Sequence, residues 1–118
     1  VFLASEECPV TDAYKNMIIE AVDTSTTLTG EKFGAPVRGI KNELTKRYHE
    51  LEEQSSTLME LEELTLGSLR RAVYDGDVEN GSVMAGQIAG LVNEIRPVKN
   101  IIEDVIKEAR EVLEKTEI

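Results

Sequence analysis

The sequence has 118 residues, of which 13 are basic and 23 acidic, so its formal net charge is -10. This acid excess excludes the basic surface that nucleic acids and anionic membranes require, and the length limits the chain to one domain at most. Because Cys8 is the single cysteine and His49 the single histidine, an internal disulfide and a Cys/His metal site are excluded. We therefore expect a cytoplasmic chain without a metal.

The first elements are a short apolar segment and an amphipathic helix. Residues 1–5 begin Val-Phe-Leu-Ala, which is typical of the end of a buried strand. A helix is predicted to start near Thr11 or Asp12, because apolar residues then recur at helical spacing. These residues are Tyr14, Met17, Ile18, Ala21 and Val22.

An extended region follows this helix. Residues 23–29 are dense in β-branched side chains, which fit a pleated strand better than a helix. Gly34 and Pro36 then interrupt the chain before residues 37–41, which can pair back as the second arm of a short hairpin. The region is therefore predicted to be a β-hairpin or an extended segment.

Two helices are predicted next, each with its own start signal. From Asn42 onward, Leu44, Tyr48 and Leu51 share one helical face. Thr57 followed by Glu60 fits a capping box, which predicts a second helix that continues to Val73 and stops at Gly76.

The last part of the chain is predicted to contain a polar loop and two more helices. The loop, residues 75–82, is rich in Gly and Asx residues. Ser82 can cap a helix that runs to about Asn93, and Pro97 can occupy the first turn of the final helix. The final helix has a continuous apolar stripe from Val98 to Leu113, so we expect it to lie on the outside of a larger body.

The segment 81–90 is the most unusual stretch of the sequence. Ala85, Gly86, Ala89 and Gly90 would leave one face of the predicted helix bare, and each glycine inside a helix costs about 1 kcal/mol relative to alanine. Two benefits can offset this cost: close packing against another element, which the composition favours, or room for a flat ligand against the backbone.

The remaining candidate residues do not form a site. His49 is interpreted as a solvated histidine rather than a catalytic base, and Cys8 as structural, because no basic neighbour activates its thiol. Arg70 and Arg71 are interpreted as surface charges that balance the acidic residues. The sequence therefore predicts no catalytic residue in this segment.

Several motifs together resemble a known family. They are Phe2-Leu-Ala-Ser-Glu6, Asp23-Thr24, Thr29-Gly30 with Gly34 and Arg38, Gly67-Ser-Leu-Arg-Arg-Ala-Val73, Gly76-Asp77 and Gly81-Ser-Val-Met-Ala-Gly-Gln-Ile-Ala-Gly-Leu91. This succession closely resembles the C-terminal part of the enoyl-acyl-carrier-protein reductase II branch of the nitronate monooxygenase (2-nitropropane dioxygenase-like) flavoproteins.

The resemblance implies a fold and an activity for a longer protein. The implied fold class is mostly α with a short β-hairpin or extended segment, as the C-terminal fragment of an FMN-binding TIM (β/α)₈ barrel. In that fragment, residues 1–5 would be the end of the last barrel strand. Residues 12–41 would form a helix and an extended segment, and residues 42–118 the closing helices. The implied activity is the NAD(P)H-dependent reduction of trans-2-enoyl thioesters carried on acyl carrier protein, in fatty-acid synthesis, by a homo-oligomer. The 118-residue segment by itself is expected to be inactive.

The resemblance also assigns cofactor-contacting residues, namely Met84, Ala85, Gly86 and Gln87, which it places close to the FMN ring. Two alternatives stay open. One is a nitronate monooxygenase on the same scaffold, and the other is a free-standing acidic helical interaction module without catalysis.

Overall fold

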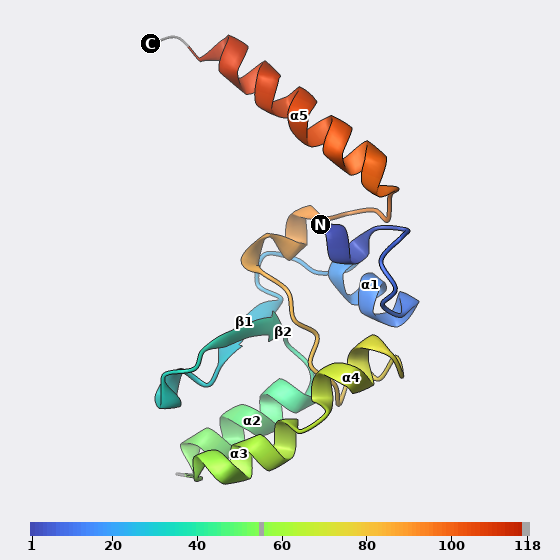
Figure 1. Cartoon of the computed structure of the whole chain (residues 1–118). Helices are drawn as coiled ribbons and strands as arrows, with labels where there is room; N and C mark the ends of the chain where they lie inside the picture. The colour runs from blue at the N-terminus through green and yellow to red at the C-terminus, as the bar shows by residue number, and fades with distance from the viewer. Residues whose placement is uncertain (55, 117–118) are drawn as a thin grey trace.

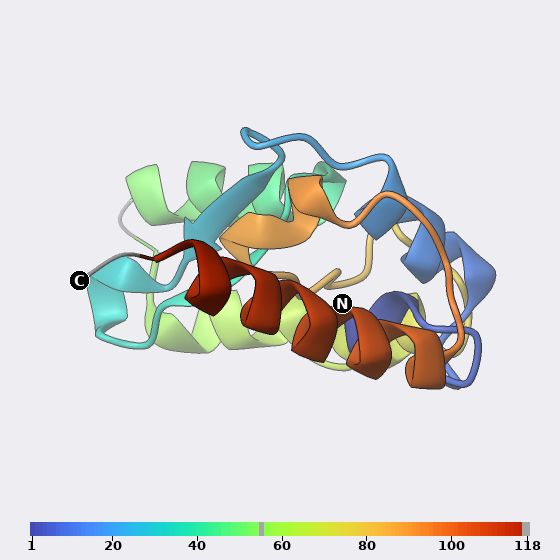
Figure 2. The ribbon, with the colours of Figure 1, turned by 90° about the horizontal axis from the view of Figure 1, so that it is seen from above.

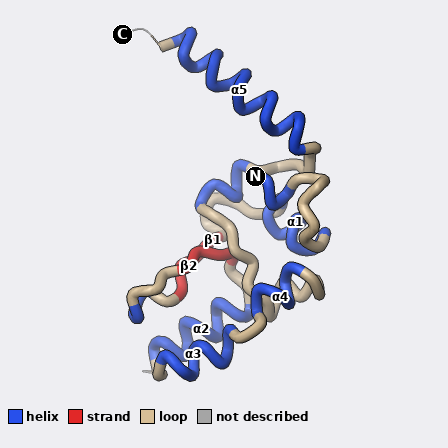
Figure 3. Tube along the Cα trace, viewed as in Figure 1, coloured by secondary structure: helices blue, strands red, loops and turns tan. Residues whose placement is uncertain are grey.

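The computed structural model describes residues 1–54 and 56–116 and is mostly helical, with one two-stranded antiparallel sheet (Figures 1 and 3). In chain order, with η for 3₁₀ helices, the elements are η1 (Phe2–Ala4), α1 (Asp12–Ile19), β1 (Thr26–Thr29), η2 (Glu31–Phe33), β2 (Val37–Ile40), α2 (Glu43–Glu53), α3 (Leu58–Thr65), α4 (Ser68–Val73), η3 (Gln87–Leu91) and α5 (Val98–Lys115).

The predicted hairpin is confirmed. Strands β1 and β2 pair from Thr26↔Ile40 to Thr29↔Val37. The connection turns at Gly30, whose φ of 81° lies in the left-handed region and where an added Cβ would come within 2.4 Å of the Ala35 carbonyl oxygen. Glycine is therefore required at this corner for both its backbone conformation and its small size.

Three of the predicted helix starts are confirmed by their caps. The Thr11 side chain accepts a hydrogen bond from the Tyr14 amide at the start of α1, and Thr57 and Glu60 form both bonds of the capping box of α3. Asn42 and Thr45 form a capping box at α2. These bonds satisfy amide groups that a helix leaves unpaired at its first turn.

Two predictions are wrong near the N-terminus and in the middle of the chain. Residues 1–5 do not form a strand, because Phe2–Ala4 is a 3₁₀ turn and the ladder is limited to one isolated bridge between Ser5 and Arg96. The helix expected from residue 58 to Val73 is two helices, α3 and α4, because Gly67 adopts a φ of 72° that breaks the helical backbone.

The predicted helix from residue 83 to about 93 is also wrong. The chain from Val83 to Gly86 is extended, and only the short η3 follows it. The physical reason is long-range: the Ile40 amide donates to the Val83 carbonyl oxygen over 2.8 Å, so the segment pairs with β2 instead of with its own next turn. The bare helical face inferred from Ala85, Gly86 and Ala89 therefore does not exist.

The core lies where α1, the hairpin, α4 and η3 meet. Its buried members come from all of these elements and from the connecting segments, which makes the middle of the molecule a single packed unit. They are Ala4, Tyr14, Ile18, Ala21, Ile40, Ala72, Val83, Ala89 and Val92. Helices α2 and α3 pack side by side at one end of this unit (Figure 1).

Helix α5 lies at the opposite end and extends away from the body (Figure 1). Seen from above, it crosses in front of the other elements (Figure 2). Ile101 is the buried residue of this helix, whereas Val112 and Leu113 are 63% and 74% exposed. The radius of gyration is 17.0 Å, against about 13.5 Å for a compact chain of this length. Within the described residues, no helix is both long and apolar enough to cross a membrane.

Candidate functional site

The segment Met84–Gln87 is held in place by β2 on one side. Met84 forms an antiparallel bridge with Gly39, and the Ala85 amide donates to the Arg38 carbonyl oxygen over 3.4 Å. An added Cβ at Gly39 would lie 2.9 Å from the Val83 carbonyl oxygen. Glycine at this strand position therefore permits the close backbone approach that brings the segment against the sheet.

Helix α1 holds the same segment from a second side. The Tyr14 hydroxyl donates a hydrogen bond of 2.7 Å to the Met84 carbonyl oxygen, and Tyr14 is 1% exposed. Burial raises the pKa of the Tyr14 phenol, and the proximity of Cys8 adds to this shift. The phenol therefore keeps its proton and remains a donor throughout the neutral pH range.

Beyond these anchors the segment faces outward. Met84, Gly86 and Gln87 are exposed and Ala85 is half-buried. An added Cβ at Gly86 would have no atom within 4 Å, so one side of the backbone there is bare. A planar group can approach such a backbone closely, because no side chain stands between them. The backbone at Gly86 is therefore open to a flat group, and the assignment of Met84–Gln87 to a flavin stays a prediction.

A groove lies next to Met84, between the hairpin and helices α2–α4. Its volume is about 270 Å³, and its lining combines hydroxyl groups with apolar side chains. Such a mixture suits a ligand that has both polar and apolar parts. The lining residues are Thr29, Ala35, Val37, Tyr48, Thr65, Ser68, Leu69, Ser82 and Met84.

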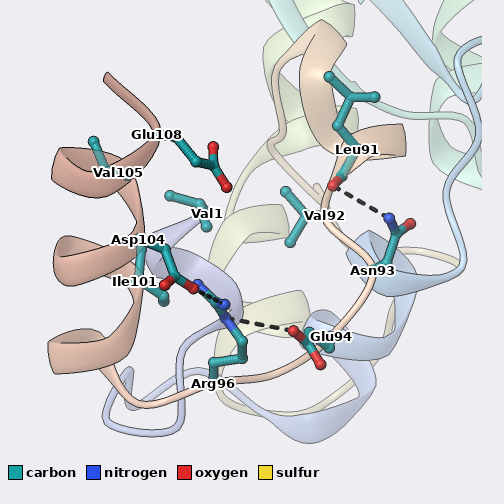
Figure 4. A pocket seen from close by; sticks show the side chains of 10 residues that line it. All are labelled: Val1, Leu91, Val92, Asn93, Glu94, Arg96, Ile101, Asp104, Val105 and Glu108. Atoms are coloured by element: carbon teal, nitrogen blue, oxygen red, sulfur yellow. Dashed lines mark hydrogen bonds and ion pairs between the residues drawn. The ribbon is translucent and has the colours of Figure 1, made fainter. Parts of the chain in front are cut away.

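A second hollow of about 360 Å³ lies between α5 and the segment 91–96 (Figure 4). Arg96 is ion-paired with both Asp104 and Glu94, and Glu108 also lines the hollow. Since three carboxylates and one guanidinium that is already paired line the hollow, it disfavours an anionic group such as a flavin phosphate. We therefore place the candidate site at Met84–Gln87.

The other residues considered from the sequence make different contacts. His49 is half-buried rather than solvated, and its Nε2 atom lies 2.7 Å from the Leu28 carbonyl oxygen, which links α2 to β1. Cys8 is a free, half-buried thiol. Across residues 1–54 and 56–116, no three His, Cys, Asp or Glu side chains are grouped so that they could hold a metal ion.

Tyr14 is the site residue that sequence reasoning missed. It was predicted only as a member of the apolar stripe of the first helix, where a tyrosine and a phenylalanine would serve equally well. The sole signal was the phenol itself, because a buried tyrosine hydroxyl usually finds a hydrogen-bond partner. The identity of that partner depends on the fold and is not encoded locally.

Comparisons with known proteins agree on one family. The family model for nitronate monooxygenase matches residues 1–108. A probable nitronate monooxygenase from Staphylococcus saprophyticus is 28% identical over 114 residues, which are 97% of this chain and 32% of the relative.

Two solved structures are more similar to this chain in sequence than the Staphylococcus saprophyticus relative is. The structure of FabK from Thermotoga maritima matches with a TM-score of 0.90 and 46% identity, over 97% of this chain and 36% of that one. A mutant of FabK from the same organism matches with a TM-score of 0.81 and 41% identity, over 97% and 33%. The chain thus spans about a third of the length of these relatives. The expectation that the segment forms the C-terminal part of its relatives is not confirmed.

Proposed function

The chain belongs to the nitronate monooxygenase family, and from this we propose that it is part of a flavin-dependent oxidoreductase with a TIM-barrel fold. The proposed reaction is the reduction of the double bond of trans-2-enoyl thioesters carried on acyl carrier protein, with NAD(P)H as reductant. FMN is the proposed cofactor, and fatty-acid synthesis the proposed pathway.

The choice of reductase rests on the pattern of similarity. The chain is 46% identical to FabK, an enoyl-acyl-carrier-protein reductase II, and 28% identical to the probable nitronate monooxygenase. The motifs around Gly67–Val73 and Gly81–Leu91 also resemble the reductase branch. Nitronate oxidation on the same scaffold is the second candidate, and the family match supports it.

The observation that carries a flavin role for this segment is the bare backbone at Gly86. Hydrogen bonds from two different elements, β2 and α1, fix Met84 and Ala85, while nothing lies within 4 Å of an added Cβ at Gly86. An outward-facing backbone that neighbouring elements hold in place, without side-chain cover, suits the face of a planar ring. When bound, FMN would relay a hydride from the nicotinamide to the substrate. Met84–Gln87 would hold the ring in place and exclude water from it.

The negative charge of the segment bears on the proposed protein partner. Acyl carrier proteins are acidic, and a segment with a net charge of -10 repels such a partner over most of its surface. We therefore propose that acyl carrier protein docks on another part of the complete protein.

The experiment that tests the proposal uses the full-length protein that contains this segment, loaded with FMN. NAD(P)H oxidation is measured with a trans-2-enoyl thioester, and oxygen uptake is measured with an alkyl nitronate. We expect thioester-dependent NAD(P)H oxidation that exceeds nitronate-dependent oxygen uptake. The reverse ratio would assign the protein to nitronate oxidation. Absence of both activities and of bound flavin would leave the helical interaction module.

A further inference from the structure

Tyr14 occupies an unusual position for a core tyrosine. Its ring belongs to the buried cluster together with Ile18 and Ala72, so a phenylalanine would fill the same space. Its hydroxyl, however, donates to the carbonyl oxygen of Met84, a residue that is 70 positions away in sequence and 38% exposed. The phenol thus connects the core to the start of the outward-facing segment.

The anchoring of Tyr14 makes this connection rigid. The side chain of Thr11 caps the first turn of α1 and also donates to the Ala72 carbonyl oxygen over 3.0 Å, and the Thr11 amide donates to the Val73 carbonyl oxygen over 3.0 Å. Helix α1 is therefore fastened to α4 directly before Tyr14. A donor on a fixed helix can set the position of its acceptor to within the tolerance of one hydrogen bond.

The second anchor of the segment is its pairing with β2, and this pairing is weaker close to Gly86. The bond between Ile40 and Val83 is 2.8 Å long, but the next bond, from the Ala85 amide to Arg38, has lengthened to 3.4 Å. The pairing with β2 thus fades as the chain approaches Gly86. The Tyr14 hydroxyl binds the Met84 carbonyl oxygen at the point where the pairing with β2 weakens. It therefore determines the orientation of the residues that follow Met84.

We infer that Tyr14 is a positioning residue for the proposed flavin site, because its hydroxyl fixes the Met84 carbonyl and thereby the orientation of Ala85, Gly86 and Gln87. It does not touch the cofactor itself. This inference rests on the proposed function, since it assigns Tyr14 a role in aligning those three residues with the flavin.

The test compares Tyr14→Phe with the wild-type full-length protein by two measurements. The first is amide hydrogen exchange of the peptide that contains Met84–Gln87, recorded without added cofactor. The second is the dissociation constant of FMN, together with the visible absorption spectrum of the bound flavin. Thr57→Ala is the matched control, because it removes the cap of α3 and lowers stability at a place remote from Tyr14.

Tyr14→Phe is expected to speed exchange in the Met84–Gln87 peptide about fivefold, which corresponds to the loss of one ordinary hydrogen bond. We also expect about fivefold weaker FMN binding and a shifted flavin spectrum, whereas Thr57→Ala changes none of these quantities. Unchanged exchange in Tyr14→Phe, or equal acceleration by Thr57→Ala, would overturn the inference. So would faster exchange with an unchanged FMN dissociation constant.

The design separates this inference from the proposed function. If the wild-type protein binds no FMN at all, the proposed function fails and so does the flavin part of the role of Tyr14. The exchange measurement needs no cofactor, so it still decides whether Tyr14 holds the segment in place.

Discussion

Gly86 and Gly90 belong to the same glycine-rich segment, yet the space around them differs. An added Cβ at Gly90 would lie 2.8 Å from the Val22 carbonyl carbon and 2.9 Å from the Asp23 amide nitrogen, which are backbone atoms that cannot rotate away. At Gly86 it would meet nothing within 4 Å. The two glycines thus represent the two benefits that the sequence left open, close packing at one and open space at the other.

This contrast predicts different costs for the same substitution. Gly90→Ala forces the turn at Val22 to move and is expected to lower the free energy of unfolding by about 1–3 kcal/mol, the usual cost of overpacking. Gly86→Ala is expected to change it by less than about 0.5 kcal/mol. Denaturant unfolding of the full-length protein measures both. Equal losses would show that the close approach at Gly90 is not a constraint on the fold.

Asn42 acts at the scale of elements, because it joins a helix start to a distant loop. Its Oδ1 accepts from the Thr45 amide at the first turn of α2, while its Nδ2 donates to the carbonyl oxygens of Val78 and Gly81, both over 2.7 Å. One side chain thus caps α2 and fixes the loop that leads to Met84.

Asn42→Ala is therefore expected to cost more than an ordinary cap. The loss of the cap contributes about 1 kcal/mol and the two lost bonds about 1 kcal/mol each, so the free energy of unfolding should fall by about 2–4 kcal/mol. Thr57→Ala, which removes a cap without such bonds, should cost about 1 kcal/mol. Asn42→Asp keeps the cap acceptor but turns a carboxylate oxygen toward the carbonyl oxygens of Val78 and Gly81, so it should cost at least as much as Asn42→Ala in the same unfolding experiment. A loss for Asn42→Ala no greater than for Thr57→Ala would contradict this role.

The elements that could be predicted from the sequence are those whose signals are local. Thr11 and Thr57 bond to amides three residues away, so the starts of α1 and α3 follow from short motifs. The extended path of Val83–Gly86 depends on pairing with Gly39 and Ile40, which no local pattern encodes. The helix predicted there failed for this reason, and the hydroxyl contact of Tyr14 was missed for the same reason.

At the scale of the whole molecule, the radius of gyration is larger than that of a compact chain of the same length. Helix α5 was predicted correctly as a helix from its apolar stripe, but Val105, Val112 and Leu113 of that stripe are exposed. The family match covers residues 1–108, while the chain spans about a third of its relatives. The exposed stripe is consistent with the proposal that this segment is one part of a larger barrel.

The central claim is that Met84–Gln87 lies against bound flavin, and hydrogen exchange of the full-length protein with and without FMN tests it most directly. Added FMN is expected to slow amide exchange in the peptide that contains these residues, since a bound ring would cover the bare backbone at Gly86. Peptides from the exposed part of α5 should exchange equally in both states. If FMN binds and leaves exchange in the Met84–Gln87 peptide unchanged, the segment does not form the flavin site.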